Sequence, residues 1–97
     1  MLGFEWDPEK AERNFLKHGV TFREAATVFR DPLGITVDDP DHSDEEDREI
    51  TIGMSTAQRL LIVAHTDRHH RVRIINAREL TRVERQAYEN EVRRRRR

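Results

Sequence analysis

The chain has 97 residues, 35% of them hydrophobic and 38% charged, which is enough for one domain with a single modest core. It contains no cysteine, so disulfide frameworks and thiolate zinc sites are excluded, and no apolar run approaches the roughly 20 residues of a membrane helix. The net charge of −1 hides an asymmetry: residues 38–49 carry eight acids against one base, and residues 68–97 carry eleven arginines against four acids. We therefore expect a cytoplasmic protein with a basic C-terminal third.

The N-terminal segment predicts a short edge strand over residues 4–6 and then a helix. Asp7 suits the N-cap, and Pro8 suits the first helical position because its fixed φ is already helical. The helix should run to about Lys17, since Gly19 can adopt the left-handed conformation that ends a helix.

A second helix begins at once. Thr21 and Glu24 have the spacing of a capping box. The apolar residues behind them recur at helical spacing, which predicts one buried face made of Phe22, Ala25, Ala26 and Phe29. Asp31-Pro32 should end this helix.

From residue 35 the apolar period changes to two, which predicts about four strands around residues 35–37, 50–54, 60–64 and 72–74. Short turns at 55–58 and 67–70 favour an antiparallel meander, with the acidic segment as a long exposed loop. Leu60 to Ala64 is apolar on both faces and should lie in the centre of the sheet.

A second capping box, Thr81 to Glu84, predicts a C-terminal helix that reaches about Val92. Residues 93–97 are five consecutive arginines, and we expect a disordered basic tail because like charges repel. The predicted architecture is one α+β domain over residues 1–92, with two N-terminal helices, about four antiparallel strands plus a short N-terminal strand, and a C-terminal helix.

Motifs for several chemistries are absent. His65 and His69 are four residues apart, but they fall at a strand end and in a turn, so we interpret them as solvent-exposed and predict no metal site. The acidic segment lacks the glycine and ligand spacing of a calcium loop. No phosphate-binding glycine loop or serine-hydrolase elbow occurs, and no cofactor is expected.

The arginines offer a different chemistry. Arg71 and Arg73 alternate with apolar residues along a predicted strand, Arg59 opens the strand before it, and Arg78 lies where the last strand meets the helix. Rigid guanidinium forks suit phosphate oxygens and a developing phosphorane. The alternative is that these are surface arginines paired with nearby acids.

Residues 73 and 78 differ by five positions, so they share a face only if the strand ends or bulges near Asn76 or Ala77. Lys17 and His18 add a phosphate-neutralising cation and a proton-transfer group. Their alternative role is to interact with the carbonyl end of the first helix.

Motifs spread over residues 4–89 resemble the BrnT toxin family. They are Phe4 to Asp7, Asn14, Lys17 to Val20, Phe22, Glu24-Ala25, Val28-Phe29, Asp31-Pro32, Asp41 to Ser43, Arg48, Ile52-Gly53, Arg71 to Arg78 (with Asn76 where many relatives have serine), Thr81, Glu84-Arg85 and Tyr88-Glu89. The resemblance implies a RelE-like fold and an endoribonuclease that cleaves RNA and inhibits translation. It also implies neutralisation by a BrnA-like ribbon-helix-helix antitoxin, contact with operator DNA only through that antitoxin, and a dimer or heterotetramer within the complex.

The resulting hypothesis is metal-independent cleavage by attack of the ribose 2′-hydroxyl on the adjacent phosphate. The candidate catalytic residues are Arg59, Arg73, Arg78, His18 and Lys17. The candidate RNA-binding residues are Arg48, Arg71 and Trp6, although Trp6 in an edge strand is also a natural core residue. The alternative function is a non-catalytic module that binds nucleic acid or the antitoxin in operon repression.

Overall fold

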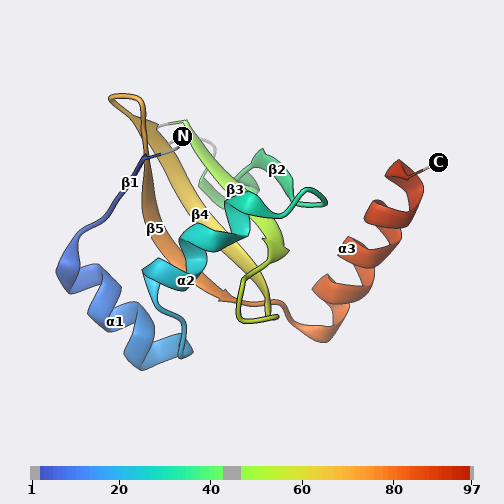
Figure 1. Cartoon of the computed structure of the whole chain (residues 1–97), viewed down its shortest axis with the longest axis horizontal. Coiled ribbons are helices and arrows are strands. Elements are labelled where there is room, and N and C mark those ends of the chain that lie inside the picture. The colour runs from blue at the N-terminus through green and yellow to red at the C-terminus, as the bar shows by residue number, and fades with distance from the viewer. Residues whose placement is uncertain (1–2, 43–46, 97) are drawn as a thin grey trace.

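The computed structural model describes residues 3–42 and 47–96, in which three helices flank one five-stranded sheet (Figure 1). The predicted α+β class is confirmed. The strand order is β1-β5-β4-β3-β2, so β4, which contains Leu60 to Ala64, is central as predicted. The elements are β1 (Gly3–Glu5), α1 (Pro8–His18), α2 (Phe22–Thr27), β2 (Ile35–Asp38), β3 (Arg48–Met54), β4 (Leu60–Arg68), β5 (Arg71–Glu79) and α3 (Arg82–Arg95), with 3-10 turns η1 (Val28–Arg30) and η2 (Pro40–His42).

The sheet is mixed. Strands β2 to β5 form the antiparallel meander that the sequence predicted. The N-terminal strand β1 instead runs parallel to β5, with Gly3 opposite Arg71 and Glu5 opposite Arg73. Because β1 covers only the first residues of β5, the rest of that edge faces helix α1.

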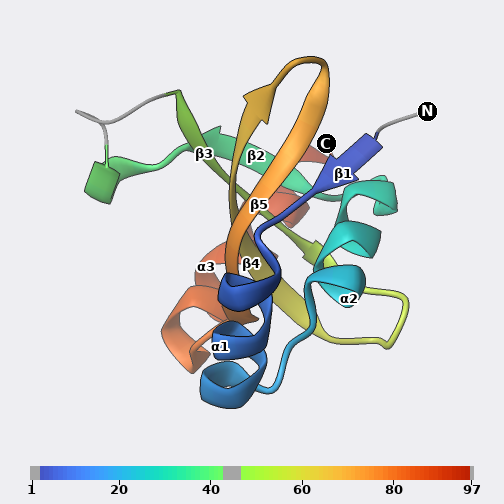
Figure 2. The same cartoon turned by 90° about the vertical axis from the view of Figure 1, so that its left-hand side faces the viewer.

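The two faces of the sheet carry separate apolar clusters. Helices α1 and α2 cover one face, where the main core includes Val20, Phe22, Leu61, Val63 and Ile74 (Figure 2). On the other face, Tyr88 and Val92 of α3 meet a smaller cluster that includes Ile35, Ile52 and Leu60. Helix α3 projects away from the rest of the molecule (Figure 1).

The local signals at the helix ends are confirmed, with one difference. Asp7 caps α1 by accepting from the Glu9 N–H at 2.9 Å, and Gly19 ends the helix with a φ of 69°. Thr81 and Glu84 form the complete capping box of α3. At α2, only the Thr21 half of the box forms, and the helix tightens into η1 at Val28, earlier than predicted.

The predicted disordered tail is partly helical. Helix α3 continues to Arg95, three residues past the predicted end. Glu91 binds Arg94 at 2.7 Å and Arg95 at 2.8 Å, one helical turn away, so these pairs offset the repulsion between the arginines. Arg97 lies outside the described residues.

A bulge in β5 allows Arg73 and Arg78, which are five positions apart, to lie on the same face of the sheet. Asn76 pairs with Ala64 and Ile74 pairs with His65, so Ile75 has no partner in β4. The extra residue lies one position before the predicted location. It places Arg73 and Arg78 on the same face of the sheet, opposite the buried Ile74 and Ala77.

One histidine prediction is wrong. His65 is only 3% exposed, because β4 extends to Arg68 and holds the ring inside the sheet against Phe29. Its Nε2 lies 2.7 Å from Thr51 Oγ1, and burial lowers its pKa. His69 and His70 do form the exposed turn after β4, both with positive φ.

Candidate active site

Arg78 is the most favourably placed arginine for binding phosphate. Its Nη1 and Nη2 atoms hold the two carboxylate oxygens of Glu84 at 2.7 and 2.9 Å, and Nη1 also donates to the Glu79 carbonyl. Among the described residues, no hydrogen bond involves Nε. The guanidinium is therefore fixed along one edge, and its Nε/Nη2 edge can still take a bidentate ligand.

The groove between α1 and β5, called the α1–β5 groove below, brings basic residues to Arg78. It has a volume of about 440 Å³ and lies along the edge of β5 that β1 leaves uncovered. Its lining residues are Lys10, Arg13, Asn14, Lys17, His18, Ile75, Asn76 and Arg78. Sequence reasoning linked Lys17, His18 and Arg78 but missed Lys10 and Arg13. Lys10 lies four residues before Asn14, and Arg13 lies four residues before Lys17, so helical spacing could have indicated that they share one face of the helix.

Asn14 sets the distance between α1 and β5. It is 7% exposed, and its amide nitrogen donates to the carbonyls of Ala77 at 2.8 Å and Val20 at 3.0 Å. Its Oδ1 accepts from the Ala77 N–H at 3.0 Å. The side chain thus occupies the place of a neighbouring strand, and it fixes Lys17 and His18 relative to Arg78.

Arg59 is not brought to this groove. It lies on the helix-covered side of the sheet, where Nε and Nη2 bind the Glu24 carboxylate and Nη2 also donates to the Gly19 carbonyl at 3.1 Å. A further bond joins Nη1 to Glu79 at 3.4 Å. With both edges of its guanidinium engaged, Arg59 connects the start of β4 to α2 and has little capacity left for phosphate.

We predict that Arg59→Ala lowers the free energy of unfolding by about 2–3 kcal/mol, since it leaves the partly buried Glu24 carboxylate without its charged partner. Burial raises the pKa of Glu24, but the Arg59 hydrogen bond is the larger effect and lowers it. Urea unfolding measures the change, and Glu24→Gln combined with Arg59→Ala should recover part of it. A single variant as stable as the wild type would contradict this structural role.

The other predicted site residues, which are Arg48, Arg71, Arg73 and Trp6, are not among the residues that line the groove. Arg73 binds Glu5 at 3.0 Å, and Arg71 lies 3.6 Å from the same carboxylate. Arg48 approaches Asp39 at 3.7 Å. The Trp6 ring packs edge-on against Phe22 in the main core, so the structure favours its core role.

The Arg78 hydrogen bonds, with help from the Thr81 backbone, lower the pKa of Glu84 to about 2. Because the folded state binds this proton more weakly than the unfolded state, the pair stabilises the fold above pH 4.5, and the contribution is lost as the pH falls toward 2. We predict that Glu84→Gln, which retains the capping geometry, is less stable than the wild type at pH 7. The difference should shrink between pH 4.5 and 2 in urea unfolding, and a difference that is independent of pH would contradict the ion pair.

No group of three or more potential metal ligands gathers within the part of the chain that the structure describes. No helix in that part is long and apolar enough to span a membrane.

Comparisons with known proteins identify relatives. A family model described as "Ribonuclease toxin, BrnT, of type II toxin-antitoxin system" matches residues 6–84. Among solved structures, the chain is similar to the Brucella abortus ribonuclease toxin BrnT, with 18% identity, 84% of this chain and 100% of that chain covered, and a TM-score of 0.66. At that identity the likeness concerns the fold alone. No curated protein matched the chain.

Proposed function

Because the chain belongs to the family of BrnT ribonuclease toxins of type II toxin-antitoxin systems, we propose that it is an endoribonuclease that cleaves RNA in the α1–β5 groove without a metal ion. Cleavage of RNA would inhibit translation. We expect the reaction to take place in the cytoplasm. The RelE-like character of the fold, which the resemblance implies, stays a prediction.

The observation that carries this proposal is the convergence of cations on one groove. Five basic or titratable side chains from α1 and β5 line it, and Arg78 has one guanidinium edge without a described partner. The residues that line the groove include no carboxylate, and the Glu84 carboxylate that binds Arg78 is already paired with that cation. The five side chains are Lys10, Arg13, Lys17, His18 and Arg78.

The proposed reaction needs only groups that RNA and this chain supply. The ribose 2′-oxygen forms a bond to phosphorus and loses its proton to a base, and the bond from phosphorus to the 5′-oxygen breaks as that oxygen gains a proton. The products are a 2′,3′-cyclic phosphate and a 5′-hydroxyl. Arg78 stabilises the charge on the phosphorane, Lys17 neutralises the phosphate, and His18 transfers a proton.

Arginines on the same face of the sheet would extend the RNA track. Arg71 and Arg73 follow β5 away from Arg78, and Arg48 lies on β3. The Glu5 carboxylate interacts with both Arg71 and Arg73, so it fixes their positions and partly neutralises their positive charge. We therefore assign them RNA binding and a smaller effect on catalysis than that of Arg78.

The family places this chain in a system with a protein antitoxin. We propose that the antitoxin is BrnA-like, with a ribbon-helix-helix domain that contacts operator DNA, and that a dimer or heterotetramer forms within the complex. The antitoxin would neutralise the toxin by covering or deforming the α1–β5 groove.

The test is cleavage of single-stranded and structured RNA by the purified chain in the presence of EDTA. We expect fragments that end in a 2′,3′-cyclic phosphate and a 5′-hydroxyl. Cleavage that occurs only with added Mg²⁺, or fragments with 5′-phosphates, would overturn the mechanism. Salt-sensitive RNA binding without cleavage would favour the non-catalytic alternative.

A further inference from the structure

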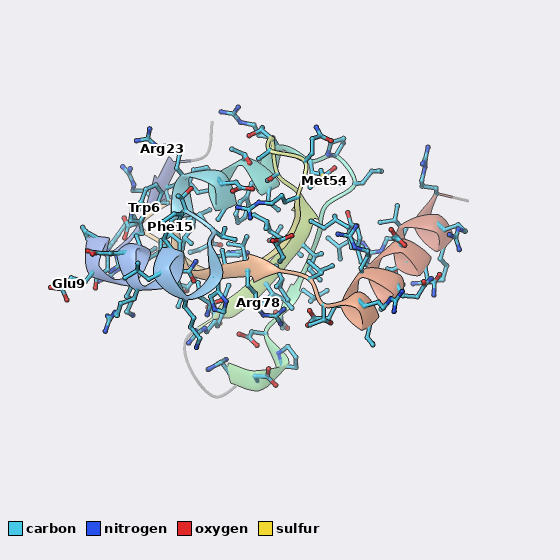
Figure 3. The ribbon with its side chains drawn as sticks, turned by 90° about the horizontal axis from the view of Figure 1, so that it is seen from below. Trp6, Glu9, Phe15, Arg23, Met54 and Arg78 are labelled. Atoms are coloured by element: carbon cyan, nitrogen blue, oxygen red, sulfur yellow. The ribbon has the colours of Figure 1, made fainter. Side chains whose placement is uncertain are left out.

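Arg78 also lines a second cavity. It has a volume of about 310 Å³, and it lies between η2 and the face of the sheet that carries Arg78. Its polar and charged lining residues are Asp39, Asp41, His42, Asn76, Arg78 and Glu84. Asn76 and Arg78 line both cavities, so a phosphate bound at Arg78 would adjoin the cavity lined by His18 and the cavity lined by His42. Figure 3 shows Arg78 next to β5, with α1 on the left and α3 on the right.

His42 is held by a buried carboxylate. Asp39 is 6% exposed, and its Oδ2 lies 3.1 Å from His42 Nδ1, whose side chain is 39% exposed. Asp39 itself is fixed, since Oδ1 accepts from the Asp41 N–H at 3.0 Å and its backbone N–H donates to the Arg48 carbonyl at 2.9 Å. Arg48 Nε, 3.7 Å from Oδ2, compensates the buried negative charge.

This arrangement selects one tautomer of the ring. An ionised carboxylate only accepts hydrogen bonds, so Nδ1 must carry the proton that joins His42 to Asp39. In the neutral ring, Nε2 then has a free lone pair, which is the form that a general base requires. A histidine in an unconstrained loop would have neither its tautomer nor its orientation fixed.

We propose that His42 is the general base of the RNA cleavage reaction and that Asp39 is its positioning residue. This proposal rests on the proposed ribonuclease function. His42 Nε2 takes the proton from the 2′-hydroxyl as its oxygen bonds to phosphorus, and His18, in the α1–β5 groove, gives a proton to the departing 5′-oxygen. The two rings return to their starting forms by exchanging protons with water.

Several charged groups surround His42. Asp39 contacts the ring, Asp41 precedes it in η2, and Arg48 acts through Asp39. Arg78 and Glu84 face it across the cavity, already paired with each other. Two of the three carboxylates thus have a cationic partner within 4 Å.

The decisive variant is His42→Asn, because the asparagine amide can replace Nδ1 as the donor to Asp39 while removing the base. We expect cleavage of a short RNA to slow by about 100-fold or more, with RNA affinity unchanged within about twofold. The limb of the pH–rate profile that reports the base should disappear. His70→Asn, which removes a histidine from the exposed β4–β5 turn, is the matched control and should cleave normally.

Asp39→Asn tests the positioning role. It should lower kcat for cleavage with little change in KM, because the ring stays present but loses its fixed orientation, an effect that a purely structural residue would not produce on the folded fraction. If His42→Asn perturbs folding, His42→Gly with added imidazole is the second measurement, and recovery of cleavage supports the base.

Normal cleavage by His42→Asn in a sample whose wild type is active overturns the role of His42 and leaves the proposed function intact. A wild type that binds RNA without cleaving it overturns the proposed function itself.

Discussion

Replacing Arg78 with alanine should slow RNA cleavage by about 10²–10³-fold, the usual loss when one group that stabilises transition-state charge is removed. Among the described residues, Arg78 is the one cation that lines both cavities, and its Nε makes no hydrogen bond to any of them. Single-turnover cleavage of a short RNA in EDTA measures the change. Arg78→Lys should recover only part of the rate, because an ammonium cannot form the two parallel bonds of a guanidinium.

The control for charge is Arg82→Ala. Arg82 lies at the exposed start of α3, so this variant removes the same charge a short distance away. It should cleave RNA at nearly the wild-type rate. A loss of stability by Arg78→Ala is expected, since Glu84 loses its partner, and the rate must therefore be measured on the folded fraction. Equal cleavage by Arg78→Ala and Arg82→Ala would show that only general charge matters.

Much of the fold follows from local signals. The caps at Asp7, Thr21 and Thr81, the left-handed Gly19 and the change of apolar period at residue 35 all act within a few residues of the chain. Such signals fix the identity and order of elements, so the starts of the three helices, the end of α1 and the central position of β4 could be predicted.

Partners that are distant in the sequence could not be predicted. Glu24 has the spacing of a capping box, but its carboxylate instead binds Arg59, 35 positions away, because that cation is fixed at the start of β4. The same contact removes Arg59 from the groove. Sequence alone offered Arg59 and Arg78 as equivalent arginines, and only the face of the sheet distinguishes them.

The acidic segment shows the same limit. Its eight acids suggest a solvated loop, yet Asp39 is buried and binds His42, which lines the same cavity as Arg78. Charge composition describes the average of a segment and does not identify the single carboxylate that the fold buries.

Asn14 is the residue whose replacement should cost most stability. Asn14→Leu retains the side-chain volume but leaves the Ala77 N–H and two carbonyls without their partners in a buried site. Each unsatisfied buried group costs about 1–3 kcal/mol, so we expect a loss of roughly 3 kcal/mol or more. For a domain whose total stability is about 5–15 kcal/mol, that is a large fraction.

The pattern of loss identifies the cause. Asn14→Asp keeps an acceptor for the Ala77 N–H but cannot donate to the carbonyls of Ala77 and Val20, so it should be destabilised as well. Asn90→Leu, on exposed α3, should change stability by less than about 0.5 kcal/mol. Urea unfolding ranks the variants, and hydrogen exchange at the Ala77 amide should accelerate in Asn14→Leu.

The same variant links stability to catalysis. Because Asn14 is the polar bridge between α1 and the bare edge of β5, its loss should let Lys17 and His18 move relative to Arg78. Cleavage by the folded protein should then fall even where denaturant curves show that the chain is folded. If Asn14→Leu were destabilised but cleaved RNA at the wild-type rate, the α1 side of the groove would be excluded from the reaction, and the chemistry would rest on Arg78 and His42 alone.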